Sequence, residues 1–213
     1  MQAPVTIIST NLNLYATDGD ICSLCDAAIN HKLQSVLVYP TNVPLCAELL
    51  DNTNIIIDSV IAYPHGRSTL QAKLSEIDSV AQLGAKAVTI FINYSALRAG
   101  EKNSIAEEIE RLTQASKKKK LKCTIAVEAS ILKSKQLKFA FKSALQAQSD
   151  AFLCSIGSTL SETSNEISQL TAKKNSSIEI VAYLKKVNAK DIEKLKKLGA
   201  STILSDGNLN KVS

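Results

Sequence analysis

Residues 60–100 read VIAYPHGRSTLQAKLSEIDSVAQLGAKAVTIFINYSALRAG, and this stretch decides the fold. A β-branched apolar run ends at Tyr63-Pro64 and is followed by a glycine-containing turn. From Leu70 onward, apolar residues recur at the spacing of an amphipathic helix, which stops at Gly84 before a second apolar run. Two apolar runs joined by a helix of this length can pair only in parallel. The stretch therefore predicts one βαβ unit.

The same alternation runs along the rest of the chain, as it must if each parallel strand is to be covered on both faces. Strands are expected at residues 5–10, 35–39, 55–63, 88–93, 123–127, 151–155, 178–183 and 202–204. Helices are expected at residues 18–31, 43–50, 70–83, 105–116, 137–147, 192–198 and in a segment that includes 167–172. Eight short apolar strands alternating with helices favour a closed (β/α)8 TIM barrel over an open doubly wound sheet.

The chain of 213 residues is interpreted as a single domain over residues 1–213. It is shorter than the roughly 250 residues typical of the fold. We therefore expect short loops and a last helix that is truncated or absent after Asp206. We find no apolar run long enough for a membrane span and no N-terminal signal segment, so the expected location is the cytoplasm.

Two local motifs are assigned structural roles. Cys22 and Cys25 have CxxC spacing but fall within an expected helix, and the five cysteines are interpreted as small buried residues. We expect no metal and no cofactor. The lysine run at residues 117–120 is interpreted as a solvated helix end. With a net charge of +5 and 4% aromatic residues, the chain is not expected to bind nucleic acid.

The 60–100 stretch also resembles the deoxyribose-phosphate aldolase family, without a gap. The matching residues are Val60, Ile61, Ala62, Tyr63, Pro64, His65, Gly66, Ser68, Thr69, Lys73, Glu76, Gly84, Ala85, Ile92, Asn93, Ala96, Leu97 and Gly100. Weaker similarity extends over nearly the whole chain, including Glu128 and Gly199-Ala200.

The resemblance implies a class I aldolase, in which a lysine amine forms a Schiff base with an aldehyde. A second lysine lowers the pKa of the first, and an aspartate helps to transfer protons. Counting from matched residues places Cys154 at the Schiff-base lysine, Val181 at the second lysine and Thr89 at the aspartate. A further aspartate of the first strand is replaced by Ile8 or, with a small gap, by Asn11.

The phosphate site implied by the resemblance is altered as well. The family has a glycine pair after its seventh strand, where this chain has Leu184-Lys185. It has a serine pair after its eighth strand, where this chain has Ser205, Asp206 and Gly207. A carboxylate there repels phosphate, whereas Lys185 and Lys186 could still supply positive charge. Ser205, Gly207, Asn93 and His65 are further candidate ligand contacts, although a turn-forming role is favoured for His65.

Three function classes remain open at this point. The first is a pseudoenzyme of this family with a binding or regulatory role, with a protein partner, a homo-oligomer or a weakly bound sugar phosphate. The second is an active aldolase that cleaves 2-deoxy-D-ribose 5-phosphate to glyceraldehyde 3-phosphate and acetaldehyde through a displaced lysine, Lys185 or Lys186. The third is a different enzyme with Cys154 as its nucleophile. The first is favoured, because no other side chain replaces an amine in Schiff-base chemistry.

Overall fold

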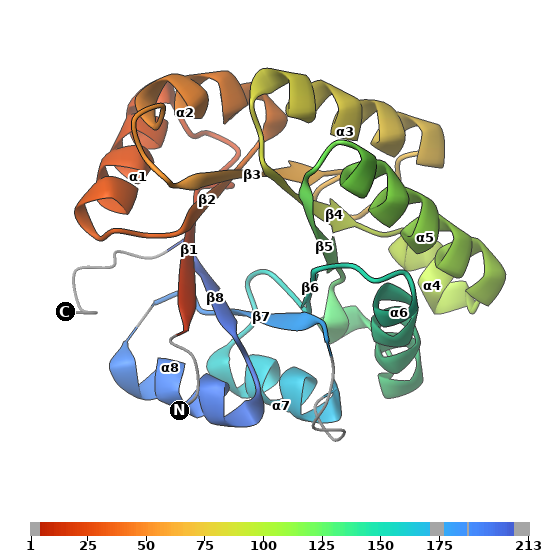
Figure 1. Cartoon of the computed structure of the whole chain (residues 1–213). Helices are drawn as coiled ribbons and strands as arrows, with labels where there is room; N and C mark the ends of the chain where they lie inside the picture. Colours follow the sequence, from red (N-terminus) through yellow and green to blue (C-terminus); the bar gives the residue numbers. More distant parts are fainter. Residues whose placement is uncertain (1–4, 171–176, 187, 207–213) are drawn as a thin grey trace.

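Parallel strands pair in sequence order and close into a barrel in the computed structural model, which describes residues 5–170, 177–186 and 188–206. Over these residues the strands are β1 (Thr6–Thr10), β2 (Ser35–Val38), β3 (Ile56–Ile61), β4 (Ala87–Phe91), β5 (Lys122–Ala126), β6 (Ala151–Leu153), β7 (Glu179–Tyr183) and β8 (Thr202–Ser205). β8 pairs with β1, for example Leu204 with Ile8, and completes the ring seen end-on in Figure 1. The predicted TIM barrel is confirmed.

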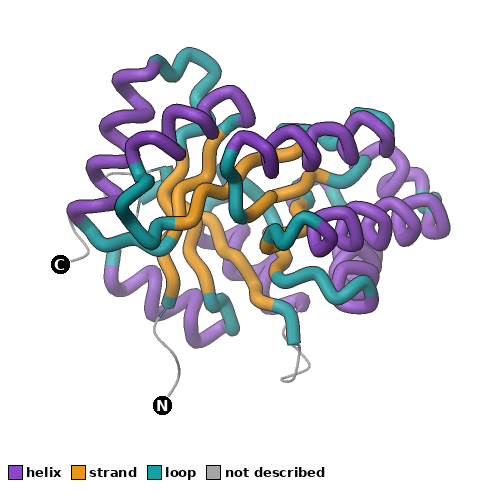
Figure 2. The backbone as a smooth tube through the Cα atoms, turned by 45° about the horizontal axis from the view of Figure 1, so that its top comes forward, coloured by secondary structure: helices purple, strands orange, loops and turns teal. Residues whose placement is uncertain are grey.

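Helices form the outer ring around the strands (Figures 1 and 2). They are α1 (Asp18–Asn30), α2 (Val43–Leu49), α3 (Leu70–Leu83), α4 (Tyr94–Ala99), α5 (Lys102–Lys118), α6 (Ser134–Gln146), α7 (Leu160–Leu170) and α8 (Ala189–Leu198), with short 3-10 helices at Pro40–Asn42 and Ala129–Ile131. The sequence pattern did not predict α4, which is only six residues long. The segment after Asp206, where a truncated last helix was expected, lies outside the described residues, as do residues 171 and 172.

The central βαβ unit follows the sequence closely. The Thr69 side chain accepts the Ala72 N–H and caps α3, and Gly84 ends the helix in the left-handed conformation, with φ of 112°. β3 and β4 are parallel, so the His65 turn and Asn93 both follow carboxyl ends of strands on one face of the barrel, as predicted. This face carries the active site in TIM-barrel enzymes.

A buried ion pair connects α3 of this unit to α5. The Lys73 side chain is fully buried, and its ammonium donates to Glu108 Oε1 at 2.6 Å and to the Phe91 carbonyl at 2.8 Å. Glu108 Oε2 accepts the backbone N–H of Asn93. Burial lowers the pKa of Lys73, and the Glu108 carboxylate opposes that shift. The pair thus connects α3, α5 and the end of β4.

Gly66 fixes the turn after β3 against the next strand. Its φ is 63°, and a Cβ built on it would lie 2.0 Å from the carbonyl oxygen of Ile92. We expect Gly66→Ala to lower the free energy of unfolding by about 3 kcal/mol, because both overpacking and left-handed strain apply.

Gly100→Ala is the matched control for this prediction. Gly100 also has a positive φ, of 82°, but nothing lies within 4 Å of the added Cβ. Only the conformational strain remains there, so about 1 kcal/mol is expected. Urea unfolding of both variants checks the difference, and equal losses would contradict the close approach at Gly66.

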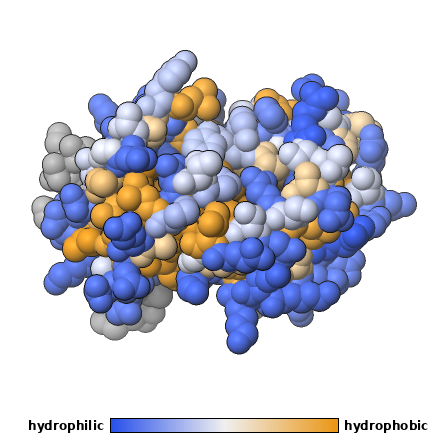
Figure 3. Space-filling model, turned by 90° about the horizontal axis from the view of Figure 1, so that it is seen from above, coloured by the Kyte–Doolittle hydropathy of each residue, from blue (hydrophilic) through white to orange (hydrophobic). Residues whose placement is uncertain are grey.

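On the face seen in Figure 3, hydrophilic side chains predominate, and apolar side chains gather between them toward the left and the centre. Among the described residues, we identify no helix that is long and apolar enough to cross a membrane.

Candidate functional site

Two neighbouring cavities open where the strands end at their carboxyl side. The larger, of about 580 Å³, is lined by Ser9, Thr10, Asn11, Leu12, Asn13, Asp20, Ser23, Leu24, Ala27, Tyr63, Ile156 and Asp206. These residues come chiefly from the end of β1, the loop after it and α1, with Asp206 following β8. The smaller cavity, of about 300 Å³, lies beside the end of β3 and shares Tyr63 with the larger one.

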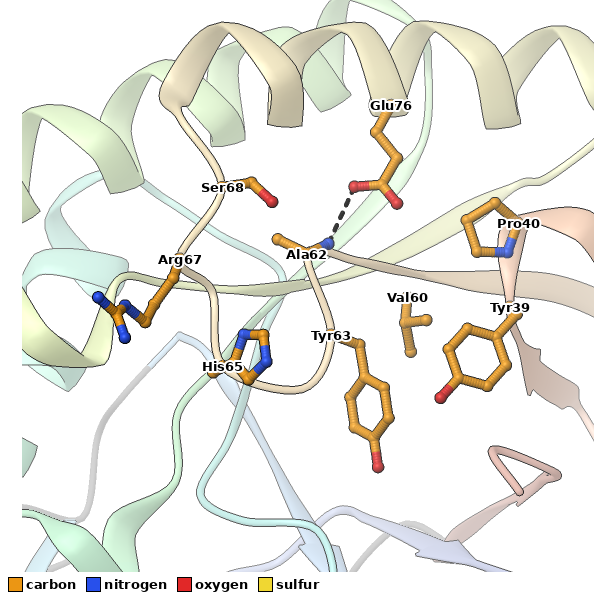
Figure 4. Close-up of a pocket in the computed structure, with 9 residues that line it drawn as sticks. All are labelled: Tyr39, Pro40, Val60, Ala62, Tyr63, His65, Arg67, Ser68 and Glu76. Carbon is orange, nitrogen blue, oxygen red and sulfur yellow. Dashed lines mark hydrogen bonds between the residues drawn. The ribbon is translucent and has the colours of Figure 1, made fainter. Parts of the chain in front are cut away.

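The smaller cavity combines tyrosines, a histidine and a half-buried carboxylate (Figure 4). Glu76 reaches from α3 toward the β3 turn, and its Oε2 accepts the Ala62 N–H at 2.9 Å. Burial raises the pKa of Glu76, while the Ala62 N–H and the charge of Lys73 oppose the shift. His65 is exposed on the turn, and Arg67 extends away from Glu76. Because Glu76 holds the backbone of the turn, a structural role for this turn is supported.

The aromatic ring of Tyr63 lines both cavities. The Tyr63 ring packs edge-to-face on Tyr39, with centroids 5.7 Å apart, and on Phe91, with centroids 5.0 Å apart. Such pairs hold a ring in a fixed orientation. Tyr63 therefore presents a fixed aromatic surface at the barrel mouth.

A third, smaller cavity identifies the side chains that face the barrel interior. This cavity measures about 50 Å³. Every strand from β1 to β8 contributes at least one residue to its lining, which includes Ile8, Asp58, Thr124 and Val181. Val181 therefore points inward. Thr89 pairs with Thr124 across β4 and β5, and directly paired residues share a face of the sheet, so Thr89 also points inward.

Thr89 contacts an interior carboxylate that the sequence analysis did not single out. Its hydroxyl donates to Asp58 Oδ2 at 2.9 Å, while Asp58 Oδ1 is buried without a hydrogen-bond partner in the described structure. Burial raises the pKa of Asp58 to about 7, although Thr89 and the charge of Lys122 lower it in part. The only sequence signal was an aspartate inside the apolar run of residues 55–63.

On β6 the inward position belongs to Leu153. Leu153 pairs directly with the inward-facing Val181, and the preceding Phe152 packs outward on Phe141 of α6. Side chains alternate along a strand, so the buried Cys154 belongs to the outer face. Burial, followed by the nearby carboxylates of Glu166 and Glu128, raises the pKa of Cys154 well above its usual range. A thiol in this environment is a poor nucleophile.

The remaining predicted site residues are dispersed. Lys185 and Lys186 follow β7 on the mouth side and are exposed, whereas Leu184 is buried. Asn93 caps α4 by accepting the N–H groups of Ser95 and Ala96. Ser205 is fully buried at the end of β8. Gly207 lies outside the described residues.

A buried polar group behind β6 was also missed by the sequence analysis. Ser155 accepts the Ala129 N–H and donates its hydroxyl to Glu166 on α7, at 3.2 Å from each carboxylate oxygen. Burial raises the pKa of Glu166 to about 7, with Ser155 opposing and Glu128 reinforcing the shift. Because its partners come from three separate segments, local sequence patterns cannot reveal it.

The two cysteines of the CxxC motif do not pair with each other as in a redox or metal motif. Cys25 is buried against Cys46 of α2, with 3.8 Å between the sulfur atoms, and Cys22 is only partly buried. Within the described ranges, no three His, Cys, Asp or Glu side chains converge as a metal site would require.

Comparison with known proteins places this barrel in a family. The family model described as DeoC/LacD family aldolase matches residues 8–138. The chain is 34% identical over 107 residues to the deoxyribose-phosphate aldolase of Methanothermobacter thermautotrophicus, a match that covers 50% of this chain and about half, 48%, of that protein. It is 29% identical over 204 residues to that of Bacillus cereus strain AH187, covering 95% of this chain and 91% of the relative.

A solved structure has the same fold. The deoxyribose phosphate aldolase of Aeropyrum pernix, described as tetrameric, superposes with a TM-score of 0.84 at 20% identity, covering 94% of this chain and 85% of that one. The family model matches well over half of the sequence, including the whole central βαβ unit. The chain therefore belongs to the DeoC/LacD aldolase family, and its relatives are deoxyribose-phosphate aldolases.

Proposed function

We propose that this chain is a deoxyribose-phosphate aldolase-like pseudoenzyme, which does not carry out Schiff-base aldol chemistry and acts through binding or regulation. The observation that carries the proposal is the interior of the barrel, where Thr89, Leu153 and Val181 face inward on β4, β6 and β7. None of these side chains is an amine or a carboxylate. Schiff-base formation requires a desolvated, nucleophilic amine.

The position of the missing Schiff-base lysine differs by one residue from the sequence-based prediction. Counting along the sequence gave Cys154, which lies on the outer face of the barrel wall. Because a Schiff-base lysine must reach a substrate at the mouth, we infer that Leu153, the inward neighbour of Val181, occupies that position. Cys154 as a nucleophile is correspondingly disfavoured by its burial. The reassignment leaves the functional proposal unchanged, since leucine and cysteine are equally unable to form an imine.

An aldolase that uses a displaced lysine is the second candidate. Lys185 and Lys186 lie just past β7, at the mouth end of the barrel. Both are exposed, so the protein supplies little of the desolvation that activates a lysine. This observation favours the pseudoenzyme.

A binding role is also compatible with a small-molecule ligand or a protein partner. A weakly bound sugar phosphate remains a candidate ligand, and a protein partner or self-association remains a candidate mode of regulation. Self-association is suggested by the Aeropyrum pernix aldolase, which is described as tetrameric. Sedimentation of the purified chain would decide whether this relative's assembly is shared.

The test is retro-aldol cleavage of 2-deoxy-D-ribose 5-phosphate by the purified chain. We expect no turnover above background, because enzymes reach rate accelerations of about 10⁶-fold or more only with their catalytic groups in place. Lys185→Ala and Lys186→Ala serve as controls. Turnover in the wild type that disappears in either variant would overturn the proposal in favour of the displaced lysine.

A further inference from the structure

We propose that the 580 Å³ cavity of the barrel mouth binds an uncharged polyhydroxy compound, such as a free sugar, in preference to a sugar phosphate. The inference rests on the proposed binding function and specifies its ligand class. A volume of this size is sufficient for a small-molecule ligand.

Negative charge in the cavity wall disfavours a phosphate. Asp20 and Asp206 both line the cavity, and the described lining contains no lysine or arginine. The backbone N–H and hydroxyl of Thr17 hold the pKa of Asp20 below its usual range, so Asp20 is charged at neutral pH. Asp206 accepts the Tyr183 hydroxyl at 2.9 Å. A phosphate dianion entering this space would be repelled by both carboxylates.

At least one backbone N–H that could offset this repulsion is already used. Leu184-Lys185 stands where the family resemblance placed a glycine pair, and the Leu184 N–H already donates to the Leu204 carbonyl at 2.9 Å. Ser205, the residue nearest the expected serine pair, is fully buried at the end of β8. The Leu184 N–H is thus not free to form part of an anion-binding nest.

The rest of the wall suits a ligand rich in hydroxyl groups. Ser9, Asn11, Asn13 and Ser23 bring uncharged groups that can both donate and accept hydrogen bonds. Tyr63 contributes an aromatic ring held by Tyr39 and Phe91. Apolar surface with a few convergent polar groups is typical of a small-molecule site, and a sugar ring offers both a C–H face and hydroxyls.

The smaller cavity provides the main alternative. It carries His65 and Arg67 on the other side of Tyr63, together with the carboxylate of Glu76. A phosphorylated sugar could be drawn there by Arg67. The experiment must therefore distinguish binding in the larger cavity from binding in the smaller one.

Binding of 2-deoxyribose and of 2-deoxyribose 5-phosphate is measured by isothermal titration on the wild-type chain. We expect the free sugar to bind roughly tenfold or more tightly than the phosphate, because two carboxylates act on the dianion. Asp206→Asn should reduce this preference several-fold, and Tyr63→Leu should weaken binding of the free sugar. Asp26→Asn, on the exposed side of α1, matches the charge change of Asp206→Asn and should alter nothing.

Two outcomes would overturn the inference. One is that 2-deoxyribose 5-phosphate binds more tightly than 2-deoxyribose. If Arg67→Ala then abolishes binding of the phosphate, that binding is assigned to the smaller cavity. The other is no binding of either sugar at millimolar concentration. Neither outcome bears on the absence of catalysis, which is measured separately by turnover. Conversely, turnover of the phosphate would refute the proposed function whatever the affinities.

Discussion

Replacing Lys73 with methionine is expected to lower the free energy of unfolding by about 3–5 kcal/mol, the usual effect of removing one partner of a buried ion pair. The Lys73 ammonium is fully buried and is bonded to Glu108 and to the Phe91 carbonyl. Methionine keeps most of the side-chain volume but leaves the Glu108 carboxylate without its counter-charge. Urea unfolding followed by circular dichroism measures the loss.

Two variants show that charge, not volume, causes this loss. Lys73→Met combined with Glu108→Gln should recover much of the stability, since the glutamine oxygen can still accept the Asn93 N–H. Lys119→Met removes the partner of Asp78 in another ion pair between the α3 and α5 regions, where both side chains are largely exposed. That variant should lose about 1 kcal/mol at most. Equal losses in Lys73→Met and Lys119→Met would contradict the account.

Replacing Asp58 with asparagine is expected to make the chain more stable at pH 8 and to change little near pH 4. The folded state raises the pKa of Asp58 from 3.8 to about 7, chiefly by burial. Ionisation of Asp58 is therefore easier in the unfolded chain, and its contribution lowers wild-type stability as pH rises from about 4 to about 7. A shift of about 3 pH units corresponds to on the order of 4 kcal/mol.

The measured quantity is the difference in unfolding free energy between wild type and Asp58→Asn across this range. Glu166 also has its pKa raised to about 7, but it titrates in both proteins and cancels. Asp51→Asn, at an exposed site after α2, makes the same change of charge outside the barrel interior and is the control. A difference for Asp58→Asn that did not change with pH would show that the interior carboxylate is not held neutral.

The fold was predictable because its signal is local and repeated. Apolar runs and helical periodicity located each strand within about two residues, and α3 was predicted with its observed bounds, Leu70 to Leu83. The caps at Thr69 and Gly84 are single-residue signals that need no tertiary context. α4 was missed because six residues are too few to show helical periodicity.

The interior of the barrel was only partly predictable. Thr89 and Val181 could be found by counting from matched residues, and both face inward. At β6 the count gave Cys154, and only strand pairing identified Leu153 as the inward residue. A shift of one residue moves a side chain to the other face of a strand, so counting without structure is least reliable there.

Contacts between distant segments could not be read from the sequence. The Lys73–Glu108 pair joins residues 35 positions apart, and the Thr89–Asp58 contact spans 31 positions. Cys25 and Cys46 meet across two helices although the sequence offered only the CxxC spacing. Such groups depend on how helices pack around the barrel, which periodicity does not encode.

The central claim is that no lysine of this chain forms a Schiff base with an aldehyde substrate. The direct measurement is incubation with 2-deoxy-D-ribose 5-phosphate or acetaldehyde and sodium borohydride, followed by intact-mass spectrometry. The account predicts no reduced adduct that maps to a single lysine of this chain, with the Bacillus cereus deoxyribose-phosphate aldolase treated in parallel for comparison. A stoichiometric reduced adduct that maps to one lysine, Lys185 or Lys186 above all, would contradict it.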